Sequence, residues 1–197
     1  MRKLYKSLIA AVAVAACAAS FSGIYAYFSD SADIKITSYS GNVNVNMDLL
    51  QRDLAHWGAY KEFEAPEFVM PESTVEEIMK LNNNGLSCYV RLKLELESSN
   101  ADLVNVDIYD CYDYDHSIWV QKGGYLYYKN VLNEPDESIT VFNNFTVPSG
   151  LTQKTNGETF KTKITVDAVQ AENFTPDFES DEPWGNIVPQ ASAVRTY

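Results

Sequence analysis

The chain has 197 residues, with 15 Lys and Arg against 27 Asp and Glu, which gives a formal net charge of −12 at pH 7. Nucleic acids and anionic membranes attract positively charged surfaces, so this charge excludes both as expected partners. Three cysteines are too few for a fold held together by a framework of disulfides, and the apolar core must therefore supply the stability.

The first 26 residues have the pattern of an export signal. Three basic residues precede the uncharged stretch LIAAVAVAACAASFSGIYAYF, and a basic start followed by an apolar run is typical of a signal peptide. We predict a signal peptide over residues 1–26 with cleavage between Ala26 and Tyr27. Lipidation at Cys17 and a retained membrane anchor stay open as alternatives. Cleavage would remove three basic residues and no acidic one, which takes the net charge from −12 to −15 and favours a soluble secreted protein.

Beyond the signal, residues 27–171 are dominated by short runs of alternating polarity that are rich in Tyr, Phe, Val, Ile and Thr. Turn residues separate several of these runs, among them Gly41-Asn42 and Gly123-Gly124. The pattern predicts strands at 34–39, 43–49, 86–97, 103–110, 117–121, 124–129, 138–147 and 160–170. Eight short antiparallel strands predict a single all-β domain, an antiparallel β-sandwich of jelly-roll type.

Three segments do not follow this alternation. Residues 50–71 mix aromatic and charged side chains, and we expect an insertion loop there. Residues 74–81 (TVEEIMKL) predict a helix capped by Ser73 or Thr74, with acidic residues near its positive end. Residues 172–197 are acidic, contain three prolines and lack alternation, so we expect an extended C-terminal tail.

Two cysteines remain after signal cleavage. Cys88 shares the apolar face of the strand predicted over 86–97 and is expected to point inward. Cys111 has the opposite parity to the apolar residues of the strand predicted over 103–110, so it should point outward unless a bulge shifts it. A Cys88–Cys111 disulfide and a pair of separate thiols, one buried and one on the surface, both stay open.

The sequence contains none of the common catalytic motifs, and its two histidines are fewer than the three protein ligands of a usual catalytic zinc site. The acidic stretch around Asp110, Asp113, Asp115 and His116 is a weak candidate for a metal site, because it lacks the glycine and the distal Glu of an EF-hand loop. A solvated acidic turn is the favoured interpretation. We therefore predict no catalytic residue, no metal, no cofactor and no small-molecule substrate, in a protein that is not an enzyme.

Several segments in order resemble the TasA and camelysin family of secreted matrix proteins. They are GIYAYFSDSADIKITSYSGNVNVNMDL (23–49), NNNGLSCYVRLKLEL (82–96), SIWVQKGGYLYYKNVL (117–132) and ITVDAVQAENF (164–174). Together they run through most of the mature chain, and the small residue followed by aromatic residues and Ser-Asp at the end of the signal is similar to that of SipW-dependent export substrates. The resemblance implies a jelly-roll protein that a SipW-type signal peptidase releases outside a Gram-positive cell.

The same resemblance implies a structural subunit of biofilm matrix fibres, with other copies of itself and accessory matrix proteins as partners. In such relatives the segment after the cleavage site can complete the sheet of the next subunit. Here this segment would be 27–39, with Ile34 and Ile36 as its inward anchors; alternatively, the strand closes its own sheet.

Two other functions stay open beside this one. The family contains members described as metallopeptidases, although this sequence departs from known zinc-protease patterns. A surface adhesin or carbohydrate binder is the third possibility, because Trp57, Trp119 and Trp184 could stack on sugar rings if they do not belong to the core.

Overall fold

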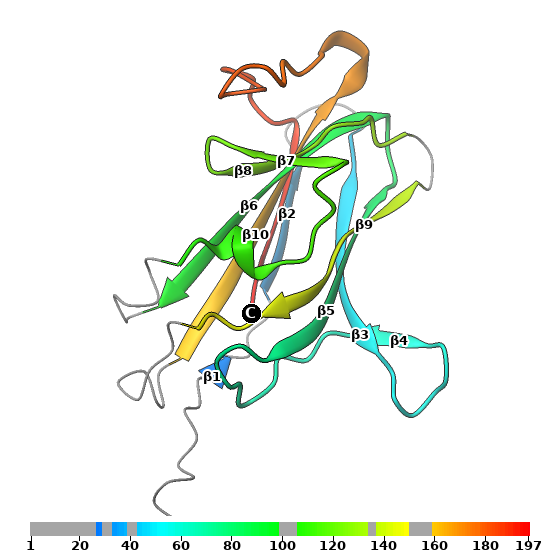
Figure 1. The fold of residues 1–197 in the computed structure, drawn as a ribbon. Helices are drawn as coiled ribbons and strands as arrows, with labels where there is room; N and C mark the ends of the chain where they lie inside the picture. The colour runs from blue at the N-terminus through cyan, green and yellow to red at the C-terminus, as the bar shows by residue number, and fades with distance from the viewer. Residues whose placement is uncertain (1–26, 29–32, 39–42, 99–105, 134–136, 150–158) are drawn as a thin grey trace, which may run out of the picture.

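Two β-sheets pack face to face across an apolar core, as a computed structural model shows (Figure 1). The structure describes residues 27–28, 33–38, 43–98, 106–133, 137–149 and 159–197. The prediction of an all-β sandwich is confirmed, and no α-helix occurs among these residues. None of the described segments is a helix long and apolar enough to cross a membrane. The predicted signal segment 1–26, including Ala26, lies outside the described residues, and the jelly-roll connectivity stays a prediction.

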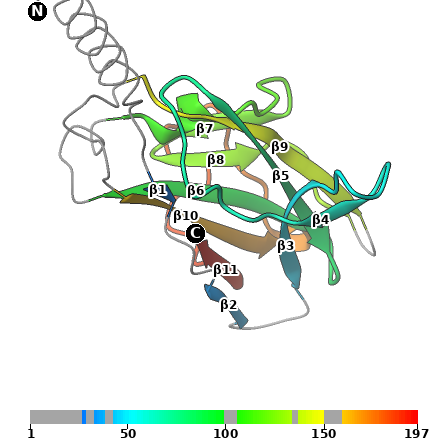
Figure 2. The same cartoon turned by 90° about the horizontal axis from the view of Figure 1, so that it is seen from below.

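The larger sheet has the order β2-β11-β10-β6-β8-β7, with β1 pairing in parallel with the start of β10, and the smaller has the order β4-β3-β5-β9 (Figure 2). The strands are β1 (Tyr27–Phe28), β2 (Asp33–Ser38), β3 (Val45–Arg52), β4 (Tyr60–Glu62), β5 (Thr74–Asn83), β6 (Cys88–Ser98), β7 (Trp119–Lys122), β8 (Tyr125–Tyr128), β9 (Ser138–Thr146), β10 (Thr159–Gln170) and β11 (Ala191–Thr196). The described residues also include two 3-10 turns, η1 (Ile108–Cys111) and η3 (Ala171–Asn173). Seven of the eight predicted strands are thus present with small shifts at their ends.

The centre of the larger sheet is the long antiparallel pair of β6 and β10, whose register runs from Phe160 opposite Ser98 to Gln170 opposite Cys88. Along β6 the side chains of Cys88, Val90, Leu92 and Leu94 are buried, whereas the intervening charged residues lie on the other face. This is the alternation that the sequence predicted, because apolar residues with a period of two gather on one face of a strand.

The predicted helix over 74–81 is wrong, because this segment is part of β5 in the middle of the smaller sheet. Leu81, for example, lies between Met47 of β3 and Ile139 of β9. Thr, Val and Ile favour strands, and pairing on both sides outweighs the helix signal of the first turn. The register with β9 shifts between Glu76 and Met79, as at a β-bulge.

The predicted C-terminal tail over 172–197 is also wrong in its last part. Residues 191–196 form β11, which lies between β10 and β2 in the larger sheet. Ala191, Ala193, Arg195 and Tyr197 alternate along it as buried residues. The segment before β11 lies against the outer face of the same sheet, where it buries Trp184.

The strand predicted over 103–110 is corrected in its described part, since Ile108–Cys111 forms the 3-10 turn η1, capped by the side chain of Asp107. This turn places Cys111 in the core, so the predicted outward orientation is wrong. Cys88 is buried as predicted, and both cysteines are free thiols rather than a disulfide. Burial raises the pKa of Cys88 to about 12 and that of Cys111 to about 11, which keeps both thiols protonated at neutral pH.

Candidate interaction surfaces

Part of the predicted insertion loop over 50–71 is a β-hairpin that projects from the smaller sheet (Figure 1). Strands β3 and β4 pair through Arg52 and Tyr60, and residues 53–59 form the tip. Asp53 closes the tip, since its N–H donates to Ala59 O at 2.9 Å and its carboxylate accepts from Ala55 N at 2.9 Å. The hydrogen bond between this carboxylate and His56 lowers the pKa of Asp53. The tip is therefore held in one shape by local hydrogen bonds.

Two large apolar side chains at this tip are fully exposed. Leu54 is 97% exposed and Trp57 is 104% exposed, and the glycine next to Trp57, Gly58, has a φ of 79° that a side chain would strain. We call Leu54 and Trp57 the hairpin knob. Two exposed apolar side chains on one tip make the knob a candidate interaction surface.

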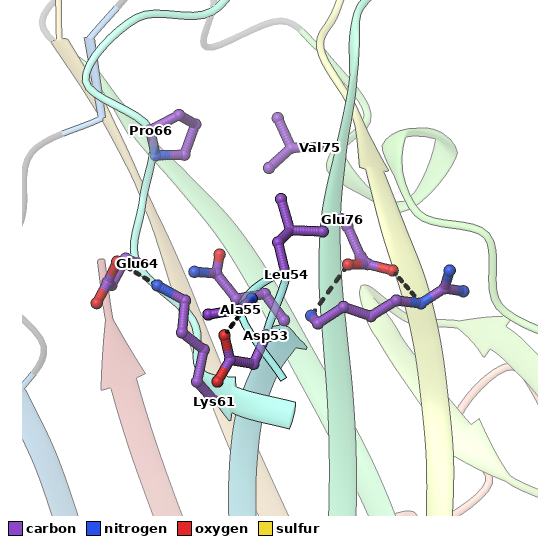
Figure 3. A pocket seen from close by; sticks show the side chains of 10 residues that line it. Asp53, Leu54, Ala55, Lys61, Glu64, Pro66, Val75 and Glu76 are labelled. Carbon is purple, nitrogen blue, oxygen red and sulfur yellow. Dashed lines mark hydrogen bonds and ion pairs between the residues drawn. The ribbon is translucent and has the colours of Figure 1, made fainter. Parts of the chain in front are cut away.

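A hollow of about 470 Å³ lies beside the knob (Figure 3). Leu54, Pro66 and Val75 line its apolar part, from the hairpin, the following loop and the start of β5. Two ion pairs border it, Lys61 with Glu64 at 2.7 Å and Arg52 with Glu76 at 2.9 Å. The hollow is thus amphipathic, and Leu54 of the knob forms part of its wall.

The three tryptophans differ in their position and exposure. Trp119 lies in the core between the sheets, and Trp184 lies under the C-terminal segment on the outer face of the larger sheet. Both are buried, so neither can stack on an external sugar ring. Only Trp57 of the three remains available for the carbohydrate contact that the sequence left open.

In the acidic stretch predicted as a weak metal candidate, Asp113 and Asp115 accept hydrogen bonds from backbone N–H groups. Asp113 accepts from the backbone N–H groups of Asn143 and Asn144 at 2.7 and 2.8 Å, and from the Asn144 side chain at 2.7 Å. Asp115 accepts from Ser117 N at 2.8 Å. Asp110 and His116 are exposed, and the His116 ring packs on Tyr114. Within the described segments, no three His, Cys, Asp or Glu side chains approach closely enough to hold a metal ion.

The second surface is the sheet edge formed by β2. This strand carries Ile34 and Ile36, which the register places opposite Arg195 and Ala193 of β11. In the described part of the larger sheet, β11 is its only neighbour, and its other side has no strand partner (Figure 2). The structure therefore places the donor candidate in its own subunit, at the outermost position of the sheet.

A buried polar cluster lies behind this edge, and the sequence did not predict it. Glu77 of β5 is fully buried, and its Oε1 accepts hydrogen bonds from the hydroxyls of Tyr197 and Tyr112. These two hydroxyls are also 3.0 Å from each other. Burial is the main reason why the pKa of Glu77 rises to about 8, so the carboxyl is mostly neutral at pH 7.

No family model, curated protein or solved structure matches the chain.

Proposed function

We propose that this protein is a secreted structural subunit of extracellular matrix fibres, and that its N-terminal strand joins one subunit to the next. The position of β2 carries the proposal: it lies at the end of the larger sheet and pairs with β11 alone among the described strands. Its partners are other copies of the same chain and accessory matrix proteins, after release by a SipW-type signal peptidase.

Exchange of β2 between subunits would keep the same backbone hydrogen bonds. The six residues Asp33–Ser38 pair with Ala191–Thr196, and an identical strand from another copy can make the same pairs. Exchange of an identical element is a low-cost route to association, because the hydrogen bonds that break within one subunit form again between two subunits. Each subunit both gives and receives a strand, so the association can continue into an open polymer.

Deletion of residues 27–39 is expected to abolish filament formation. Electron microscopy of purified chain 27–197 should show filaments, whereas chain 40–197 should stay monomeric because it lacks the strand that pairs with β11. Filaments from both chains, or monomers from both, would contradict strand donation.

A matched control keeps the strand but ties it to its own subunit. Ile36→Cys together with Ala193→Cys places cysteines at paired positions of β2 and β11. The oxidised variant should fail to form filaments and should regain them on reduction, since the only difference is whether β2 can leave.

The hairpin knob supports a second candidate function, adhesion to a polysaccharide or another cell-surface polymer. Trp57 is fully exposed on the tip and lines a hollow of about 560 Å³ together with Arg52 and Asp53. A flat indole in this position can stack on a sugar ring while nearby polar groups bind its hydroxyls. The fibre role and this role are compatible, because the knob and the β2 edge lie on different sheets.

Trp57→Ala is expected to lower retention on a cell-wall polysaccharide column by about tenfold, the loss typical of an aromatic residue central to an interface. Val188→Ala is the matched control, because Val188 is also exposed and apolar but lies just before β11. Equal retention of the wild type and both variants would remove the knob from the binding site, and a wild type that is not retained would reject adhesion to that polymer.

A further inference from the structure

The Glu77 cluster joins the two sheets at the edge that carries β2. Glu77 belongs to β5 of the smaller sheet, and Tyr197 directly follows β11 of the larger sheet. The Tyr197 hydroxyl donates to Glu77, while its backbone N–H and C=O both bond to Thr162 of β10, at 3.1 and 2.8 Å. Tyr197 is thus fixed at both ends, and its side chain is one of two polar links from the end of β11 to the opposite sheet, beside the Arg195–Glu62 pair.

Burial favours the neutral form of Glu77 and outweighs the opposing effect of the Tyr197 and Tyr112 hydrogen bonds and of Arg195. Oε2 of Glu77 has no hydrogen-bond partner in the described structure, and a buried carboxylate oxygen without one is costly. The titratable and charged groups that face it are Tyr112 from the segment after η1, Tyr197, and Arg195 of β11. Arg195 is itself paired with Glu62 of β4 at 2.8 Å, so it does not fully compensate a negative charge on Glu77.

Aromatic packing fixes the two tyrosines. The ring of Tyr197 meets Phe63 edge-on at 5.6 Å between centroids. Tyr112 packs on Phe142 at 4.1 Å and on Phe145 at 5.1 Å. Because both rings are packed in this way, neither hydroxyl can change its position unless its ring moves. A small rearrangement of the tyrosines therefore cannot compensate the charge that forms when Glu77 ionises.

We propose that Glu77, Tyr112 and Tyr197 form a proton-dependent latch, and that loss of the Glu77 proton releases β11, together with β2, from the edge of the sandwich. Because β2 pairs only with β11 among the described strands, opening of β11 also frees the strand proposed to pass between subunits. The use of the latch in assembly rests on the proposed fibre function, whereas the latch itself does not.

The direction of the effect follows from proton binding. In the closed latch the Glu77 pKa is about 8, and in the open form, where water reaches the carboxyl, it returns toward its ordinary value of 4.5. Between these two values opening releases a proton, so the opening constant increases by up to about tenfold per pH unit. Above the pKa of the closed form the carboxyl is charged in both forms, and the opening constant no longer changes with pH.

Amide hydrogen exchange of dilute chain 27–197 at pH 5, 6.5 and 8, corrected for intrinsic rates, tests the latch. Amides of β11 and β2 should open at least about tenfold more often than those of β6, with an opening constant that increases with pH. Glu77→Gln keeps the size of the side chain but cannot ionise, so its opening constant should not change with pH. Glu67→Gln, which alters an exposed carboxyl, should behave like the wild type.

Two results would overturn the latch: opening of β11 only together with β6, or a pH slope that Glu77→Gln retains. If that variant does not fold, a carbon-13 NMR titration of the wild-type Glu carboxyls decides instead. One Glu should titrate near pH 8, and its absence would reject the proposal. A pH-dependent latch in a protein that never forms filaments supports the latch and rejects the fibre role.

Discussion

Trp184→Ala is expected to lower the free energy of unfolding by about 3 to 5 kcal/mol, the usual cost of truncating a large buried aromatic side chain. Trp184 is only 2% exposed. Its indole meets the rings of Tyr127 and Phe174 edge-on, each at 6.0 Å between centroids. The Arg91 guanidinium lies 4.6 Å from the indole centroid. Truncation would remove all three contacts and leave a cavity under the C-terminal segment.

Urea denaturation followed by circular dichroism measures this loss without depending on tryptophan fluorescence. Trp57→Ala is the matched control, because the same substitution at a fully exposed position should change the free energy of unfolding by less than about 0.5 kcal/mol. A loss below about 1 kcal/mol for Trp184→Ala would mean that the segment before β11 does not pack on the sheet.

Arg91 explains why this segment stays on the outer face of the larger sheet. Its guanidinium lies between the rings of Tyr125, at 4.0 Å, and Trp184, and its Nε donates to Asp167 at 3.0 Å. Asp167 also accepts from the Ser192 hydroxyl of β11 at 2.9 Å. A charged residue that is stacked and paired in this way fixes the segment by geometry as well as by buried area.

Strands β6 and β10 were found within a few residues because apolar residues recur on one face. In β6 Val and Leu occupy every second position, and in β10 Ile164 and Val166 do so between Thr162 and Ala168. In β11 the inward positions are Ala191, Ala193 and Arg195, which do not read as an apolar face. Ala191 and Ala193 are buried although they are small, and Arg195 is paired with Glu62 of the other sheet. These contacts belong to the tertiary structure, and the residue types of β11 alone do not show them.

Of the candidate surfaces, too, the sequence predicted one part and missed another. The insertion loop predicted over 50–71 is confirmed only in part, because residues 50–52 belong to β3 and residues 60–62 form β4. Glu77 was missed because a glutamate beside Glu76 reads as part of a solvated face. Glu77 has the same strand parity as the buried Met79 and Leu81, so it points inward once the segment is known to be β5 rather than a helix.

The buried carboxyl of Glu77 also predicts that the free energy of unfolding of the whole domain depends strongly on pH. The Glu77 pKa is about 8 in the folded chain against 4.5 for the ordinary carboxyl, so between these values the folded state holds a proton that the unfolded state has lost. A raised acid pKa therefore makes stability fall as pH rises. The contribution of Glu77 is at most about 1.4 kcal/mol per pH unit, or about 4 kcal/mol from pH 5 to pH 8.

Glu77→Gln should remove this slope, because glutamine has nearly the same shape and stays neutral. Urea unfolding at pH 5, 6.5 and 8 should give similar free energies for wild type and variant at pH 5, and an increasingly more stable variant toward pH 8. Glu67→Gln should follow the wild type at each pH, since an exposed carboxyl has no burial cost to lose. Parallel curves for wild type and Glu77→Gln would show that the carboxyl ionises in the folded state at an ordinary pH, and that Arg195 or water reaches it.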